Sequence, residues 1–132
     1  MTGPMMQSET RRTPSAAGAE LNDVYFVEFA GEPLSLYNAA DVLVMMGGFT
    51  MVEAVGLDKQ VVSAPLKDKN DQLERTIRFG RLGYVIPVPP DEFSADRLAR
   101  PVQIGLLSSP APNDLSFDGL EIAGSVLAAA LP

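Results

Sequence analysis

The sequence contains no cysteine, no histidine and no tryptophan. Without cysteine, the chain can form neither a disulfide framework nor a thiolate metal site, which agrees with a reducing, cytoplasmic location. Without histidine, it lacks the commonest general base near neutral pH and the commonest zinc ligand. Acid or base chemistry would therefore fall to Asp or Glu side chains or to another chain, and we expect neither a metal site nor a cofactor.

Positive charge and long apolar runs are also scarce. Lys and Arg together number 10 against 17 for Asp and Glu, which gives a net charge of −7. Such a surface repels phosphate backbones, so nucleic acid is not an expected partner. The apolar stretch IAGSVLAAALP near the C-terminus is shorter than the roughly 20 residues that cross a bilayer, and we expect no membrane span.

What remains is the composition of an ordinary globular domain. With 132 residues, 46% of them hydrophobic and 20% charged, the chain is long enough for one core. Residues 1–23 have no apolar run that would suit a secretory signal, and they are predicted to be a disordered tail. Residues 24–107 are predicted to form the folded domain, and residues 108–132 a linker followed by a last helix.

Strands and helices are predicted to alternate along the domain. Strands are expected at 24–29, 41–46, 60–64 and 84–88, and helices at 33–40, 50–57, 71–82, 94–100 and 117–132. The run DVLVMM is apolar on both faces, which is typical of a parallel sheet covered by helices. This order predicts an α/β fold with a parallel sheet of three to four strands and flanking helices.

Finer features of these elements are also predicted. Pro87 places the strand at 84–88 on a sheet edge, because proline cannot donate to the ladder. Gly56 closes the helix at 50–57 and Gly83 the helix at 71–82. Ser94 caps the helix at 94–100, which Pro101 is expected to break or kink.

The helix at 71–82 is expected to follow a polar loop. Asp68 and Asn70 are its two candidate N-caps. Leu73, Ile77 and Gly80 are predicted to share one face of this helix. Arg75, Arg78 and Arg81 are interpreted as a solvated face.

The stretch GGFTMVE lies where a predicted strand passes into a helix. Gly47 and Gly48 allow a sharp turn and a close approach of the backbone to a ligand. The amides near Thr50 are helix-start donors that a phosphate oxygen satisfies well. Glu53 has two interpretations: it closes a capping box with Thr50, or its carboxylate accepts the hydroxyls of a ribose.

Asp71 and Gln72 open the helix that follows the next strand. In an open α/β sheet they would lie at the same edge as the glycine turn. A carboxylate beside a carboxamide offers acceptors and donors for neighbouring hydroxyls of a sugar. Asp71 can equally be a favourable negative charge at a helix N-terminus, and its position does not separate the two interpretations.

Together these motifs resemble the C-terminal, donor-binding half of the family 28 glycosyltransferases, which have the GT-B fold. The resemblance covers residues 24–100. It depends on Gly47-Gly48-Phe49-Thr50 with Glu53, then Pro65, and then the pair Asp71-Gln72. It implies a Rossmann-like domain that is a partial GT-B C-terminal domain.

The resemblance also implies a role for each motif. The donor diphosphate would contact the turn at Gly47, Gly48, Phe49 and Thr50, and Glu53 would bind the ribose. Asp71 and Gln72 would hold the transferred sugar. The implied ligand is a nucleotide-diphosphate sugar, a UDP-sugar in particular. No GxGxxG or GxxxxGK[ST] motif supports a nucleotide-dependent oxidoreductase or a kinase instead.

The sequence departs from the family where the acceptor domain and the first glycine-rich strand would stand. We therefore expect a donor-binding module for hexosyl transfer to an acceptor hydroxyl, active only with an acceptor-binding domain or partner chain. The alternative is an inactive, truncated fragment that serves only as a folded or oligomerising domain. An uncovered sheet edge would allow the chain to form a homo-oligomer.

Overall fold

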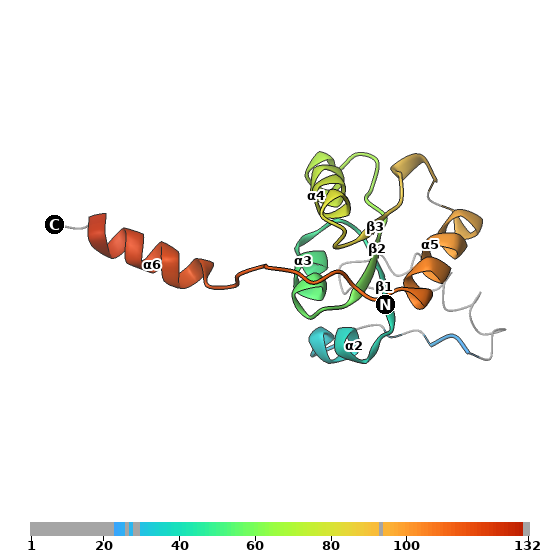
Figure 1. Ribbon diagram of the computed structural model, residues 1–132, viewed down its shortest axis with the longest axis horizontal. Coiled ribbons are helices and arrows are strands. Elements are labelled where there is room, and N and C mark those ends of the chain that lie inside the picture. Colours follow the sequence, from blue (N-terminus) through green and yellow to red (C-terminus); the bar gives the residue numbers. More distant parts are fainter. Residues whose placement is uncertain (1–22, 26, 28–29, 93, 131–132) are drawn as a thin grey trace. The chain divides into compact units, whose positions relative to one another are not determined.

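The centre of the fold is a small parallel sheet. The computed structural model describes residues 23–25, 27, 30–92 and 94–130. The strands are β1 (Val42–Met45), β2 (Gln60–Ser63) and β3 (Ile86–Pro87). They lie in the order β1-β2-β3, with Val42 opposite Gln60 and Val62 opposite Ile86, and both pairings are parallel (Figure 1). The predicted α/β fold with a parallel sheet is confirmed, as is the edge position of the strand that contains Pro87.

The helices of the described residues are α2 (Pro33–Ala39), α3 (Phe49–Gly56), α4 (Asn70–Arg81), α5 (Ala95–Leu107) and α6 (Gly119–Ala130), with a 3-10 turn at Pro90–Glu92. Helices α3, α4 and α5 pack against the strands, and two further helices lie before and after them in the chain. Helix α3 connects β1 to β2, and α4 connects β2 to β3. The chain divides into two compact units, residues 1–36 and 37–132, and the sheet belongs to the second. No helix in the described ranges is long and apolar enough to cross a membrane.

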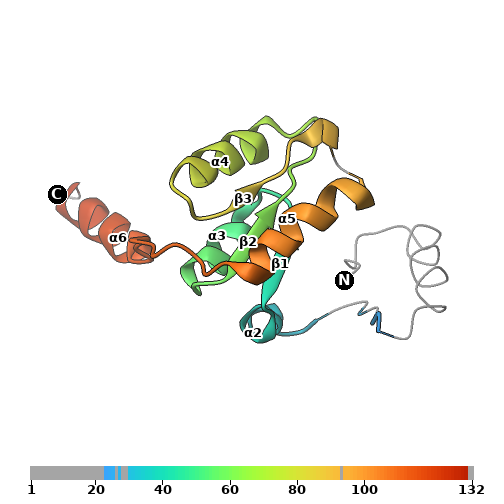
Figure 2. The ribbon, with the colours of Figure 1, turned by 45° about the vertical axis from the view of Figure 1, so that its right-hand side comes forward.

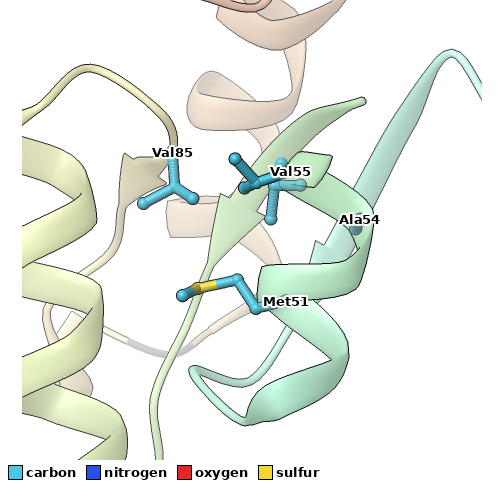
Figure 3. Close-up of a cluster of buried hydrophobic side chains, with 5 residues drawn as sticks. Met51, Ala54, Val55 and Val85 are labelled. Carbon is cyan, nitrogen blue, oxygen red and sulfur yellow. The ribbon is translucent and has the colours of Figure 1, made fainter. Parts of the chain in front are cut away.

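The core lies on both faces of the sheet, since successive side chains of a strand point to opposite faces. One face packs against α3 and α4, and its buried cluster is Met51, Ala54, Val55, Val61 and Val85 (Figure 3). The other face packs against α5, with Val62, Ala64 and Val88 buried beside Leu98 and Val102. Figure 2 shows α5 on the opposite side of the sheet from α3 and α4. The strand that is buried on both faces is β2, whereas Val44 of β1 is half exposed.

A glycine ends α4, as predicted. Gly83 has a positive φ of 78° and donates its amide to the Gly80 carbonyl, while the amide of Tyr84 donates to Phe79. This pair of bonds is the Schellman arrangement, in which the residue after the helix takes a left-handed conformation. The rings of Phe79 and Tyr84 then meet edge to face, with their centroids 5.8 Å apart, so the two side chains pack on each other.

Replacing Gly83 by alanine is expected to lower the free energy of unfolding by about 1 kcal/mol, because a Cβ disfavours the left-handed conformation. Gly83→Asn should cost less, since asparagine tolerates that conformation better. Urea denaturation of both variants measures the difference. Equal losses for alanine and asparagine would contradict the assignment.

Pro101 does not break the helix that contains it, so that part of the prediction is wrong. Helix α5 begins after Ser94, whose hydroxyl accepts from the amide of Arg97 as predicted, and it continues through Pro101. Leu98 and Val102 on either side of the proline both pack into the sheet cluster. Their burial outweighs the hydrogen bond that the proline removes.

Three details of the other helices also differ from expectation. Helix α4 starts at Asn70 with Lys69 as its N-cap, and no side chain caps it, so neither Asp68 nor Asn70 does so. Its buried face carries Thr76, whereas Ile77 is 41% exposed. The third difference is the way in which α3 ends near Gly56.

Gly56 does not close α3 by a left-handed turn, because the residue with positive φ there is Asp58, at 55°. Instead, a Cβ on Gly56 would lie 2.2 Å from the ring of Phe117. The Asn113 side chain donates to the carbonyl of Val55 and to Asp58. The segment before α6 therefore packs on the end of α3.

A third hydrogen bond attaches this segment near the end of α4. Tyr84 donates to the carboxylate of Asp114, and this bond raises the pKa of Tyr84 above its ordinary value. The last predicted helix is present as α6, and its described residues are all exposed.

Part of the N-terminal prediction falls outside the described residues. The tail predicted over residues 1–23 is described only at Asp23, and the strand predicted over 24–29 only at Val24, Tyr25 and Val27. These three residues are not in a strand. The division into a tail, a domain over 24–107 and a C-terminal segment stays a prediction.

Candidate functional site

The turn between β1 and α3 leaves helix-start amides unpaired. Helix α3 begins at Phe49 with Gly48 as N-cap, and no side chain caps it. The Gly48 amide donates to the Met46 carbonyl at 2.7 Å. Within the described part of the chain, the amides of Phe49 and Thr50 have no acceptor. Both residues are exposed, and their amides lie at the positive end of α3, where an anion is favoured.

The two glycines of this turn have different roles. Neither has a positive φ, so the turn does not depend on glycine's conformational freedom. Gly47 is buried, and a Cβ there would lie 2.4 Å from both the Gln72 carbonyl oxygen and the Thr76 hydroxyl. At Gly48 the nearest atom to an added Cβ is 3.8 Å away. Gly47 is therefore required for packing against α4, and the accessible part of the turn starts at Gly48.

Arg75 connects α4 to the turn between β1 and α3. Its Nη1 donates to the Gly47 carbonyl at 2.5 Å, and its guanidinium carbon lies 4.7 Å from the centroid of the Phe49 ring. Only 20% of its side chain is exposed, so the interpretation of Arg75 as part of a solvated face is wrong. Arg78 and Arg81 are exposed as predicted. The spacing of Arg75 four residues after Asp71 is a sequence signal for the 3.9 Å ion pair between them.

Glu53 does not close a capping box. Because α3 already begins at Phe49, Thr50 is a helical residue, and Glu53 lies too far along the helix to reach back to the N-cap. The Glu53 side chain is exposed, and its carboxylate has no hydrogen bond or ion pair with any described residue. It is available to a ligand bound at the start of α3.

Asp71 and Gln72 lie in the first turn of α4, next to the glycine turn. The Asp71 side chain is 69% exposed. The Gln72 Oε1 accepts from the Leu66 amide at a long 3.4 Å, which leaves its amide group able to donate elsewhere. The close approach of Gly47 to the Gln72 backbone shows that the glycine turn meets the first turn of α4 at the carboxyl edge of the sheet.

Two lysines extend the positive charge at this edge. Lys67 and Lys69 lie in the loop between β2 and α4, and Lys67 forms an exposed ion pair with Asp91 at 3.0 Å. Of the cations at this edge, Arg75 is the one that contacts the turn with the unpaired amides, in a chain with a net charge of −7. No group of His, Cys, Asp and Glu side chains among the described residues could hold a metal ion. The edge is therefore suited to an anion held by amides and cations.

Comparisons of the chain with protein families, with curated proteins and with solved structures find no match. The assignment of a function therefore depends on the geometry of the site. This geometry offers two unpaired amides and an arginine for an anion, a free carboxylate one helical turn away, and a carboxylate and a carboxamide on the adjacent helix.

Proposed function

We propose that this chain is the donor-binding module of a glycosyltransferase and that it binds a nucleotide-diphosphate sugar. The observation that carries the proposal is the pair of unpaired amides at Phe49 and Thr50, followed on the same helix by the free carboxylate of Glu53. The amides suit a diphosphate, and the carboxylate suits the vicinal hydroxyls of a ribose. The resemblance of the two motifs to family 28 glycosyltransferases supports the same assignment.

The transferred sugar is placed beside the first turn of α4. Asp71 accepts from its hydroxyls, and the Gln72 carboxamide donates as well as accepts. The loop contact through Gly47 brings this turn next to the start of α3, so one ligand can reach both. In this arrangement the diphosphate lies between the ribose and the sugar, as the chemistry of the donor requires.

The reaction is a displacement at the anomeric carbon by an acceptor hydroxyl. The bond from the anomeric carbon to the diphosphate oxygen breaks, and the unpaired amides stabilise the negative charge that develops on the leaving diphosphate. The acceptor hydroxyl gives its proton to a base on an acceptor-binding domain or partner chain. Activity therefore requires that partner, whereas donor binding does not.

Titration calorimetry with UDP tests the proposal, with GDP as the comparison for the base. We expect saturable binding, and we expect Glu53→Gln to weaken it about tenfold, because hydrogen bonds to a charged acceptor are lost. The variant should bind 2′,3′-dideoxyuridine diphosphate as the wild type does, since this ligand lacks the hydroxyls that Glu53 accepts.

Glu121→Gln in α6 is the matched control, because it removes the same charge outside the site. It should leave UDP affinity unchanged. The proposal fails if neither UDP nor GDP binds, or if Glu53→Gln binds UDP as tightly as the wild type.

A second candidate function is a folded domain that oligomerises without catalysis. It is favoured by the position of β1 at the sheet edge. The side chains of Val44 in this strand and of Met46 just after it are half exposed. An unpaired strand edge of this kind can pair with another strand. A stable dimer in analytical ultracentrifugation, together with no nucleotide binding, would favour this function over the first.

A further inference from the structure

Arg75 contacts the residues on both sides of Gly48. It donates to the carbonyl of Gly47 and lies over the ring of Phe49, so its guanidinium is held next to the turn from which the unpaired amides emerge. The bond to the Gly47 carbonyl and the contact with the face of the Phe49 ring together orient the guanidinium before any ligand arrives. A cation oriented in this way loses little entropy when it binds.

The charge of Arg75 is incompletely neutralised. Its acidic neighbour, Asp71, is 3.9 Å from Nη2, at the limit of an ion pair, and that carboxylate is mostly exposed to solvent. The Gly47 carbonyl takes one N–H of the guanidinium, and an arginine has several more. Arg75 can therefore keep its bond to the turn and still donate to an anion.

We infer that Arg75 is a further ligand-binding residue, which holds the second phosphate of the diphosphate and selects a nucleoside diphosphate over a monophosphate. This inference depends on the proposed function. The amides of Phe49 and Thr50 are close together in the chain and suit one phosphate group. The planar guanidinium suits the oxygens of the other phosphate. The α3 amides are uncharged and give that phosphate no charged partner.

The test compares Arg75→Gln with Arg78→Gln. Both variants remove one positive charge from α4, but Arg78 is exposed and Arg75 contacts the turn. Calorimetric titrations with UDP and with UMP give two affinities, and from them a UDP to UMP ratio, for the wild type and for each variant. We expect Arg75→Gln to weaken UDP binding by about tenfold or more and UMP binding much less, so that the ratio falls. Arg78→Gln should leave the ratio as in the wild type.

Arg75→Lys keeps the charge but loses the planar array of donors, and should recover only part of the UDP preference. This variant also serves if Arg75→Gln does not fold, which circular dichroism and thermal unfolding will show. A purely structural role for Arg75 predicts equal losses for UDP and UMP, and that result, or an unchanged ratio in both Arg75 variants, overturns the inference alone. No binding of UDP by the wild type overturns the proposed function as well.

Discussion

Gly47→Ala is expected to lower the free energy of unfolding by about 3 kcal/mol, the upper part of the range for overpacked positions. The added Cβ would lie 2.4 Å from the Gln72 carbonyl oxygen, which is backbone and cannot move away as a flexible side chain can. It would also lie 2.4 Å from the Thr76 hydroxyl, which is buried and already hydrogen-bonded to Ser63. Relief requires the whole turn to move away from α4.

The same movement would affect the candidate site. Arg75 donates to the carbonyl of Gly47, so a displaced turn loses its connection to α4. We therefore expect Gly47→Ala to weaken nucleotide binding in addition to destabilising the fold. Urea denaturation measures the first effect, and a UDP titration, well below the unfolding transition, measures the second.

Gly48→Ala is the matched control, one residue along the chain. Its φ of −77° and ψ of −173° are open to any residue, and the nearest atom to an added Cβ is 3.8 Å away. We expect a change in stability within about 0.5 kcal/mol, as for other substitutions that meet no packed neighbour. If the two alanine variants are equally stable, Gly47 does not pack against α4 as described.

This pair of glycines illustrates what the sequence can and cannot predict. A repeated glycine between a strand and a helix indicates a tight loop at the sheet edge, and the loop is there. The sequence does not say which glycine packs and which is open, because that depends on Gln72 and Thr76, more than twenty residues away in the chain. The expected reason, conformational freedom, applies at Gly83 instead.

The fold itself was predictable because its signals are local. The apolar runs that became β1 and β2 are separated by one short amphipathic helix, and this order is enough to predict a parallel pair. The predicted break at Pro101 is absent because a local rule was overridden by the packing of Leu98 and Val102 against the sheet. Local pattern therefore predicted the elements better than their ends.

The candidate site was predictable only in part. Thr50, Glu53, Asp71 and Gln72 were named from motifs, and the structure places the turn before α3 in contact with the first turns of α4. Arg75 was missed because three arginines at helical spacing resemble a solvated face. Only its contacts with Gly47 and with Phe49 at the start of α3 distinguish it from Arg78.

The second large effect is expected at the buried pair that joins α4 to β2. The hydroxyls of Ser63 and Thr76 are 2.7 Å apart, and both residues are almost fully buried. Thr76→Val keeps the shape of the side chain but leaves the Ser63 hydroxyl without its partner. An unsatisfied buried hydroxyl costs on the order of 2 kcal/mol, so we expect the free energy of unfolding to fall by about that amount.

Ser63→Ala should cost less than Thr76→Val. The Thr76 hydroxyl left behind lies on a helix, where a threonine can donate to the carbonyl four residues earlier, that of Gln72. In the double variant Ser63→Ala/Thr76→Val no hydroxyl remains unsatisfied. It should therefore be more stable than Thr76→Val alone, with a coupling energy of about 1 kcal/mol in a double-mutant cycle. Strict additivity of the two single losses in urea denaturation would show that the hydroxyls do not bond to each other.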